Sequence, residues 1–213
     1  MKNNSIKAIL FDMDGVVIDS EKLYSQSETN VLSNYGIKFD DSDWQFVKGC
    51  TEKQFYDHVY LKYNPQVPRK ELIIECREFL KKLFSKKLEY MEGFKEIHLY
   101  LKKKFKLALV TSTGPELVSH IDKLLDIRNN FNLVITSLDT QAHKPSPDPY
   151  IKAMNSFGLL PNQCIVVEDS IQGIKSGKAA GCRVIALEGS LEKDLLVDAD
   201  YIISNLYEMQ KIV

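Results

Sequence analysis

The sequence predicts an α/β fold in which a parallel sheet alternates with helices and one helical segment interrupts the alternation. Three observations lead to this prediction: short apolar runs, helical spacing of apolar residues between them, and one long interval with helical spacing only. Short, unbroken runs rich in β-branched residues are typical of strands buried on both faces of a parallel sheet. The runs are Ala8–Phe11, Leu107–Val110, Leu133–Ile135, Ile165–Val167, Val184–Leu187 and Tyr201–Ile203.

The intervals between later runs predict helices. Apolar side chains recur there at positions that share one helix face. Alternation of such segments with strands favours a parallel sheet. The two clearest faces consist of Leu117, Val118, Ile121, Leu124 and Leu125, and of Tyr150, Ile151, Met154 and Phe157.

The long interval, from about residue 19 to about residue 88, has helical periodicity and no convincing strand. Two regular stripes, over residues 23–32 and 72–88, flank an aromatic-rich segment, and Gly36 is a plausible helix stop. We therefore expect a core of residues 1–17 and 89–213 and a small second domain of residues 18–88, which is helical and inserted after the first strand. The hinges are expected near residues 17–20 and 88–93.

Composition excludes several classes of protein. The chain has 213 residues, a formal net charge of −1, 44% hydrophobic and 27% charged residues, as in a globular protein without a bias toward nucleic acid or anionic membranes. Its four cysteines form no CxxC pair, which argues against a zinc site and suits a reducing compartment. The first apolar stretch is broken by charge and no stretch approaches the roughly 20 apolar residues of a membrane span. We expect a cytoplasmic protein.

Polar side chains follow four of the apolar runs, where each predicted strand ends. In a parallel α/β sheet, ligands bind beyond the carboxyl ends of the strands, so these side chains are expected to gather at one edge. The residues are Asp12, Asp14, Thr111, Ser112, Lys144, Glu168 and Asp169.

This set of side chains suits phosphoryl transfer. Carboxylates are hard ligands of the kind that Mg²⁺ prefers, and a carboxylate can also attack phosphorus to form an aspartyl-phosphate. A lysine and hydroxyl or backbone donors can stabilise the charge on the transferring group. Enzymes accelerate phosphate-monoester hydrolysis by up to about 10²¹-fold, so several such contributions are required.

Local signals place helix N-termini beside the same residues. Pro115 follows the loop 111–114 at the first position of a predicted helix, and Ser170 can cap the helix after Asp169. Ser146-Pro147-Asp148 is a further helix start just beyond Lys144. Free N–H groups and the positive dipole end of a helix favour phosphate binding.

Four segments carry a family resemblance, in a fixed order over nearly the whole chain. They resemble the haloacid dehalogenase-like hydrolase superfamily, and within it the β-phosphoglucomutase-like and phosphoglycolate-phosphatase-like enzymes with a helical cap. The resemblance implies a Rossmann-like parallel sheet core, an inserted α-helical cap and a phosphoric monoester hydrolase. The segments are Asp12-Met13-Asp14-Gly15-Val16 with Asp19-Ser20-Glu21, Val110-Thr111-Ser112, Lys144-Pro145-Ser146-Pro147-Asp148, and Val167-Glu168-Asp169-Ser170 with Gly173 and Ala179-Ala180-Gly181.

The resemblance also implies roles for the individual residues. Asp12 is expected to be the nucleophile and a metal ligand, and Asp14 the acid and base, with its backbone carbonyl on the metal. Lys144 is expected to pair with Asp12 and with the phosphoryl oxygens. Thr111 and Ser112 are expected to hold phosphate, and Glu168 and Asp169 to complete the Mg²⁺ site.

Two positions depart from the mutases of this subgroup. These carry a histidine on the first cap helix and an arginine on the cap loop, where this chain has Tyr24 and Glu52. A glutamate would repel a second phosphate. The sequence therefore favours a Mg²⁺-dependent phosphatase acting on a small phosphorylated metabolite through an aspartyl-phosphate; the alternative is a phosphomutase of the β-phosphoglucomutase type acting on a sugar phosphate.

Other interpretations fit less well. The Asp-x-Asp-Gly stretch does not continue as a calcium loop, the intact catalytic set disfavours a non-catalytic scaffold, and Asp14 with the metal pair fits phosphate better than halide chemistry. The segment Gly49-Cys50-Thr51-Glu52 lies where the family has a loop that dips toward the site, and contact with substrate stays open there. We expect a monomer whose partner is a small phosphorylated metabolite, without nucleic acid or membrane.

Overall fold

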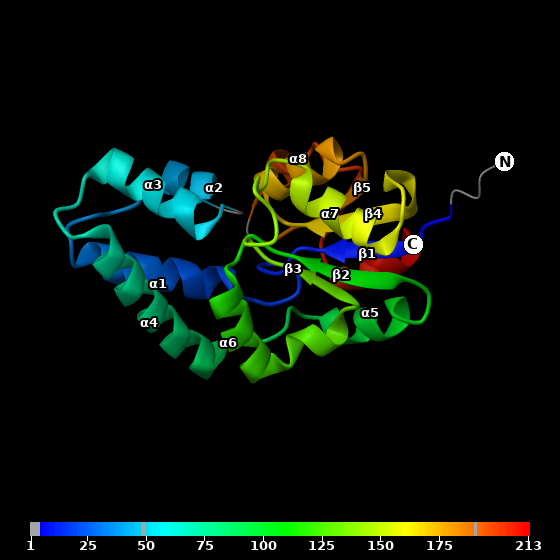
Figure 1. The fold of residues 1–213 in the computed structure, drawn as a ribbon, viewed down its shortest axis with the longest axis horizontal. Helices are drawn as coiled ribbons and strands as arrows, with labels where there is room; N and C mark the ends of the chain where they lie inside the picture. Colours follow the sequence, from blue (N-terminus) through cyan, green and yellow to red (C-terminus); the bar gives the residue numbers. More distant parts are fainter. Residues whose placement is uncertain (1–4, 48–49, 190) are drawn as a thin grey trace.

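The computed structural model describes residues 5–47, 50–189 and 191–213 and has an α/β architecture (Figure 1). Within these residues, six parallel strands form one sheet in the order β3-β2-β1-β4-β5-β6. Every predicted strand is present, with ends that differ by no more than one residue. The strands are β1 (Ala8–Phe11), β2 (Lys106–Val110), β3 (Leu133–Ile135), β4 (Cys164–Glu168), β5 (Arg183–Leu187) and β6 (Tyr201–Ile203).

Helices cover both faces of the sheet, and alternate strand residues point into the two layers. On one face, side chains such as Ile9 and Phe11 pack with α5 (Phe94–Leu101), α6 (Pro115–Leu125) and the 3₁₀ helix η4 (Leu206–Lys211). On the other, Ala8 and Leu10 pack with α7 (Asp148–Phe157) and α8 (Ile171–Ala179). Three further 3₁₀ helices among the described residues are η1 (Ile127–Asn130), η2 (Pro161–Gln163) and η3 (Lys193–Leu195).

The strand order determines where a ligand can bind. The chain runs outward from β1 through β2 to β3 on one side, and then crosses to β4 and continues to β6 on the other. The order therefore reverses beside β1, between its neighbours β2 and β4. Ligands of open α/β sheets bind at such a switch point, beyond the carboxyl ends of the strands.

The described part of the insertion after β1 consists of four α-helices, which extend to one side of the sheet in Figure 1. A hydrophobic cluster of its own, which includes Val31, Tyr56, Val59 and Leu72, holds these helices together. The helices are α1 (Glu21–Ser33), α2 (Asp41–Val47), α3 (Glu52–Tyr63) and α4 (Arg69–Lys87).

Two crossing segments join the insertion to the sheet. The Met91 amide donates to the Val17 carbonyl at 3.0 Å, and the Asp19 amide donates to the Glu89 carbonyl at 3.0 Å. Ile18 and Tyr90 pair as an antiparallel bridge between these bonds. These bonds lie beside residues 17 and 89, where the sequence predicts the boundaries between core and insertion. The division into two domains stays a prediction.

Some details differ from the expectation. Helix α5 was not predicted, and Leu124 and Ile151, assigned to apolar helix faces, are 39% and 38% exposed. Gly36 follows the end of α1 with a positive φ of 71°, as expected of a helix stop. All four cysteines are free. No helix in the described ranges is long and apolar enough to cross a membrane.

Candidate active site

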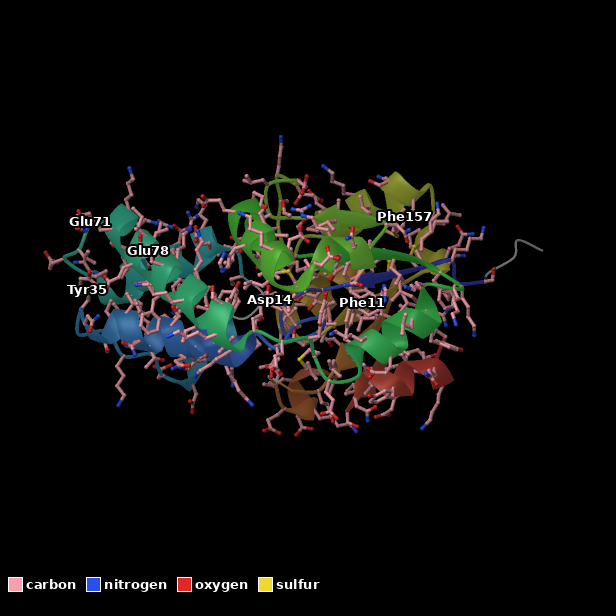
Figure 2. The ribbon with its side chains drawn as sticks, turned by 90° about the horizontal axis from the view of Figure 1, so that it is seen from below. Phe11, Asp14, Tyr35, Glu71, Glu78 and Phe157 are labelled. Atoms are coloured by element: carbon pink, nitrogen blue, oxygen red, sulfur yellow. The ribbon has the colours of Figure 1, made fainter. Side chains whose placement is uncertain are left out.

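The predicted site residues lie at the carboxyl edge of the sheet, around the switch point. Asp12 directly follows β1, and its amide continues the sheet pairing by donating to the Val167 carbonyl at 2.9 Å. The Thr111 amide, directly after β2, donates in the same way to the Ile135 carbonyl at 2.9 Å. Figure 2 shows Asp14 where the helical insertion meets the sheet.

Lys144 is the cation at the centre of this edge, and only 2% of its surface is exposed. Its Nζ donates to Asp12 Oδ1, to Glu168 Oε1 at 2.6 Å and to the Val110 carbonyl at 3.0 Å. These three acceptors use all three N–H bonds of the ammonium group. A loop after β3 thereby delivers one lysine to the ends of β1, β2 and β4.

The charges of this cluster are unbalanced. Burial disfavours the charged ammonium, but the carboxylates of Asp12 and Glu168 outweigh that effect and raise the pKa of Lys144. Burial also raises the pKa of Asp12 well above its ordinary value, against the attraction of Lys144. Two buried carboxylates thus share one ammonium, and Asp169 lies beside them with 4% of its surface exposed.

A divalent cation fits this donor set. Asp12, Glu168 and Asp169 each offer a carboxylate oxygen, and these oxygens lie within 4.8 Å of one another. All of the offered atoms are hard oxygen ligands, as Mg²⁺ prefers, and a double positive charge would offset the excess of carboxylates. The structure therefore has a buried acidic cluster of the kind that was predicted to hold Mg²⁺.

Asp14 is held by two hydroxyl groups. Ser20 Oγ donates to its Oδ1 at 2.7 Å, and Thr113 Oγ1 donates to its Oδ2 at 2.8 Å. Burial raises the pKa of Asp14 from its ordinary value, and these two hydrogen bonds oppose the shift. The carboxyl group is therefore oriented from both sides and can carry a proton at a higher pH than a free aspartate.

The loop after β2 lies against the N-terminus of α6. Gly114 caps this helix and Pro115 occupies its first turn, as predicted. Thr111 is buried and its Oγ1 accepts from the Thr113 amide at 3.0 Å. The loop that carries Thr111 and Ser112 thus comes to the same edge as Asp14.

Helices of the insertion contact the core beside this loop. The hydroxyls of Tyr24 and Thr113 lie 3.4 Å apart, so α1 reaches the residue that holds Asp14. Arg77 of α4 pairs with Glu52 through two contacts of 2.6 Å and with Glu116 of α6 at 3.0 Å. Glu52 is therefore neutralised within the insertion. Gly49 of the segment Gly49–Glu52 lies outside the described residues.

Thr113 and Tyr150 are two residues whose contacts the sequence did not indicate. Thr113 stood in the hydroxyl-rich run after β2, so its place at the sheet edge was predictable but its bond to Asp14 was not. Tyr150 was assigned to an apolar helix stripe. Its ring is buried there, but its hydroxyl donates to Glu168 Oε1 at 2.7 Å.

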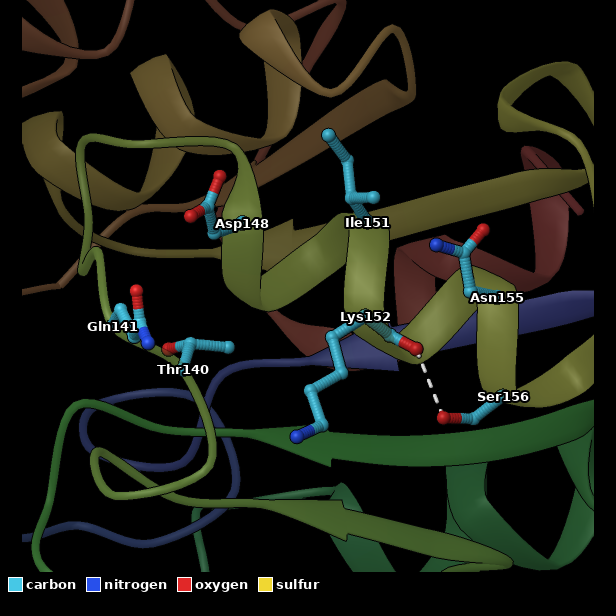
Figure 3. A pocket seen from close by; sticks show the side chains of 7 residues that line it. All are labelled: Thr140, Gln141, Asp148, Ile151, Lys152, Asn155 and Ser156. Carbon is cyan, nitrogen blue, oxygen red and sulfur yellow. Dashed lines mark hydrogen bonds between the residues drawn. The ribbon is translucent and has the colours of Figure 1, made fainter.

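A surface hollow of about 560 Å³ lies elsewhere, between α7 and the loop before it (Figure 3). Thr140, Gln141, Asp148 and Lys152 contribute polar groups to it. Lys152 Nζ donates to the Asp139 carbonyl, and its own carbonyl accepts from Ser156 Oγ at 2.9 Å. The lining lacks the grouping of several carboxylates around one lysine that distinguishes the sheet edge.

Comparison with known proteins assigns the chain to a family and agrees with the fold. The model of the haloacid dehalogenase-like hydrolases matches residues 9–187, so the chain belongs to that family. The phosphorylated carbohydrates phosphatase of Thermotoga maritima is 28% identical over 177 residues, which cover 83% of this chain and 82% of the relative. Hexitol phosphatase B of Escherichia coli is 25% identical over 211 residues, with 96% and 94% covered.

A solved structure shows the same fold. The β-phosphoglucomutase of Clostridium difficile superposes with a TM-score of 0.81 at 18% identity, over 97% of this chain and 96% of that one. The chain is an enzyme of the haloacid dehalogenase-like family, and the phosphatases among its relatives support the predicted class of phosphoric monoester hydrolases.

Proposed function

We propose that this chain is a Mg²⁺-dependent phosphatase that hydrolyses a small phosphorylated sugar or polyol through an aspartyl-phosphate on Asp12. The observation that carries the proposal is the buried contact of Lys144 with Asp12, beside Asp14 and Asp169. The names of two relatives, a phosphorylated carbohydrates phosphatase and a hexitol phosphatase, support the substrate class.

The first step transfers the phosphoryl group to the protein. A carboxylate oxygen of Asp12 forms a bond to phosphorus while the bond from phosphorus to the leaving oxygen breaks. The leaving oxygen keeps the electron pair and takes a proton from Asp14. The raised pKa of Asp14 favours the protonated form that this step needs.

The second step returns Asp12 to its free form. Asp14, now ionised, takes a proton from a water molecule, whose oxygen attacks phosphorus. The bond between phosphorus and the Asp12 oxygen breaks, and inorganic phosphate leaves. Ser20 and Thr113 hold Asp14 in one orientation for both proton transfers.

Other residues of the chain neutralise charge and hold the phosphoryl group. Mg²⁺ would be held by Asp12, Asp169 and the Asp14 carbonyl, with Glu168 as the fourth predicted ligand, and when bound it would neutralise charge on the phosphoryl oxygens. Thr111 and Ser112, in the loop before α6, are assigned to the phosphate. Lys144 is assigned to the phosphoryl oxygens and to the Asp12 carboxylate.

The ion pair of Glu52 with Arg77 favours a phosphatase over a phosphomutase. A mutase must hold a bisphosphate intermediate by its second phosphate, and the sequence places Glu52 where the mutases have an arginine. Arg77 is the nearby cation, but it is occupied by two carboxylates, Glu52 and Glu116. A second phosphate would have to displace them.

The test is a phosphate-release assay on the purified chain. We expect turnover of p-nitrophenyl phosphate that EDTA abolishes and Mg²⁺ restores, and release of free phosphate from sugar or polyol phosphates. A panel that also includes phosphoglycolate, nucleotides and cofactor phosphates defines the preference. Lack of phosphate release from every compound would overturn the proposal.

The same panel distinguishes the alternative. A phosphomutase would convert a sugar phosphate into its isomer, would depend on a bisphosphate activator, and would release little free phosphate. Chromatography of the products separates isomerisation from hydrolysis. Isomer as the main product would replace the phosphatase assignment by the mutase.

A further inference from the structure

Donors from several elements surround the carboxyl group of Glu168, which is 0% exposed. Its Oε1 accepts from Lys144 Nζ at 2.6 Å and from the Tyr150 hydroxyl at 2.7 Å. Its Oε2 accepts from Ser170 Oγ at 3.0 Å, and from the amides of Asp169 at 3.2 Å and Ser170 at 3.4 Å. Glu168 thus accepts five donors from its own chain.

Five donors saturate this carboxylate. Its two oxygens offer about four lone-pair sites in total, so none is left for a direct bond to a metal ion. The arrangement is also fixed from the side of α8, because a Cβ at Gly173 would overlap the Glu168 carboxyl group. The chain therefore fixes the Glu168 carboxyl group with Oε2 at the N-terminus of α8 and Oε1 against Lys144.

Of the five donors, only the Tyr150 hydroxyl comes from neither Lys144 nor the residues at the N-terminus of α8. It lies fully buried on α7, and Lys144 Nζ lies 5.2 Å from its ring centroid. Burial raises the pKa of Tyr150 well above its ordinary value, so the phenol stays protonated and acts as a donor. Phenylalanine would fill the same apolar space. The hydroxyl of Tyr150 is therefore explained by its hydrogen bond to Glu168 and not by packing.

We propose that Tyr150 is a positioning residue whose hydroxyl fixes Glu168 as the counter-ion of Lys144, and that Glu168 serves the lysine and does not ligate the metal. The proposal deepens the proposed function, on which it rests, and it assigns metal binding to Asp12 and Asp169 with the Asp14 carbonyl. It replaces the role that the sequence suggested for Glu168.

The position of the lysine matters because its three N–H bonds are all occupied. When Asp12 forms its bond to phosphorus it loses its negative charge, and the N–H that it accepted becomes available to a phosphoryl oxygen. The bonds to Glu168 and to the Val110 carbonyl then hold the ammonium group in place. Loosening Glu168 should therefore slow the chemical step more than it weakens substrate binding.

The first experiment compares Tyr150→Phe with Tyr60→Phe. Tyr60 lies in the insertion, and its hydroxyl donates to the Val67 carbonyl at 2.7 Å, so this control removes a hydrogen bond of equal length away from the site. With p-nitrophenyl phosphate, we expect Tyr150→Phe to lower kcat about tenfold, as for loss of one hydrogen bond to a charged group, with KM within about twofold of wild type. An unchanged kcat would overturn the proposal.

The second experiment measures Mg²⁺ binding by calorimetry, which needs no turnover. We expect Asp169→Asn to weaken Mg²⁺ binding at least about 100-fold, Glu168→Gln to weaken it by about tenfold or less through the loss of a nearby negative charge, and Tyr150→Phe to change it by less than about threefold. Equal weakening by Glu168→Gln and Asp169→Asn would show that Glu168 ligates the metal and would overturn the proposal. A wild-type protein that releases no phosphate would refute the proposed function instead, and the calorimetric comparison would still decide this inference.

Gly173→Ala provides an independent variant in case Tyr150→Phe does not fold. It moves the Glu168 carboxyl group without removing a charge, and alanine suits the helix in which Gly173 lies. We expect kcat to fall more than for Tyr150→Phe while thermal unfolding stays cooperative. A folded Gly173→Ala protein with wild-type kcat would contradict the role of Glu168.

Discussion

Replacement of Gly15 by alanine tests how closely the backbone after β1 approaches the metal cluster. Gly15 has a φ of +76°, which costs an L-residue roughly 1 kcal/mol. A Cβ there would lie 2.9 Å from Asp169 Cγ and closer still to Asp169 Oδ2, so the Asp169 carboxyl group must rotate away. An off-rotamer side chain adds about another 1 kcal/mol. We expect Gly15→Ala to cost about 2 kcal/mol of unfolding free energy and to weaken Mg²⁺ binding by about 10- to 100-fold.

Gly36→Ala is the matched control. Gly36 has a similar φ of +71°, but a Cβ there would meet nothing within 4 Å. We expect this variant to lose only the backbone contribution of about 1 kcal/mol, a decrease of roughly 2–4 °C in melting temperature, and to bind Mg²⁺ as wild type does. Urea unfolding and calorimetric Mg²⁺ titration of both variants separate the two effects. Equal Mg²⁺ affinities in Gly15→Ala and Gly36→Ala would refute the argument from close approach.

Changes at the two aspartates separate the chemical steps. Asp12→Asn should lower kcat by at least about 10³-fold and leave no phosphorylated protein in mass spectra, because the nucleophile is lost; turnover near the wild-type rate would exclude Asp12 as nucleophile. Asp14→Asn should slow the transfer of phosphate to Asp12 from a sugar phosphate by about 10²- to 10⁴-fold, but the same transfer from p-nitrophenyl phosphate much less in a single-turnover assay, because nitrophenolate leaves without a proton; equal losses in this transfer step would argue against an acid role. In EDTA, the free energy of unfolding should fall as the pH rises above about 4, because the raised pKa of Asp12 means that the folded state keeps a proton that the unfolded state has lost. Asp12→Asn should reduce the decrease of unfolding free energy with pH, as measured by urea titration at several pH values. Burial lowers the pKa of His98, which makes an opposite contribution, but this contribution is the same in both proteins and cancels in the difference.

The central strands were predictable from the sequence because burial on both faces leaves an unbroken apolar run, as in Ala8–Phe11 and Ile165–Val167. The edge strand β3 was recognised as well, although its first two residues are only half-buried. Ile151 is partly exposed in α7 because helical spacing gives the direction of a side chain and not the extent of the surface that covers it. Helix α5 has a compact stripe, with Phe94, Ile97 and Leu101 buried, which a closer search for helical spacing would have found.

The site was predictable to the extent that it follows from strand ends. Asp12 and Thr111 continue their strands, so sequence position alone brings them to the same edge. Hydrogen bonds between elements far apart in sequence were not predictable. Thr113 to Asp14 and Tyr150 to Glu168 join residues 99 and 18 positions apart, and neither spacing carries a periodic signal. The roles assigned to the site residues stay predictions that the variants above test.

The charge of the site connects its chemistry to the stability of the chain. Burying Asp12, Glu168 and Lys144 together costs free energy unless attraction and hydrogen bonds compensate, and one ammonium group cannot neutralise two carboxylates. Glu168 is compensated by four further donors, one of them Tyr150, whereas Asp12 pairs with Lys144, so the charge that a metal ion would neutralise is that of Asp12, beside Asp169. Those are the residues at which a metal ion and a phosphoryl group would bind. A fully neutralised cluster would stabilise the free protein but would leave Asp12 a weaker nucleophile and a poorer ligand, so the imbalance at Asp12 is what the proposed reaction requires.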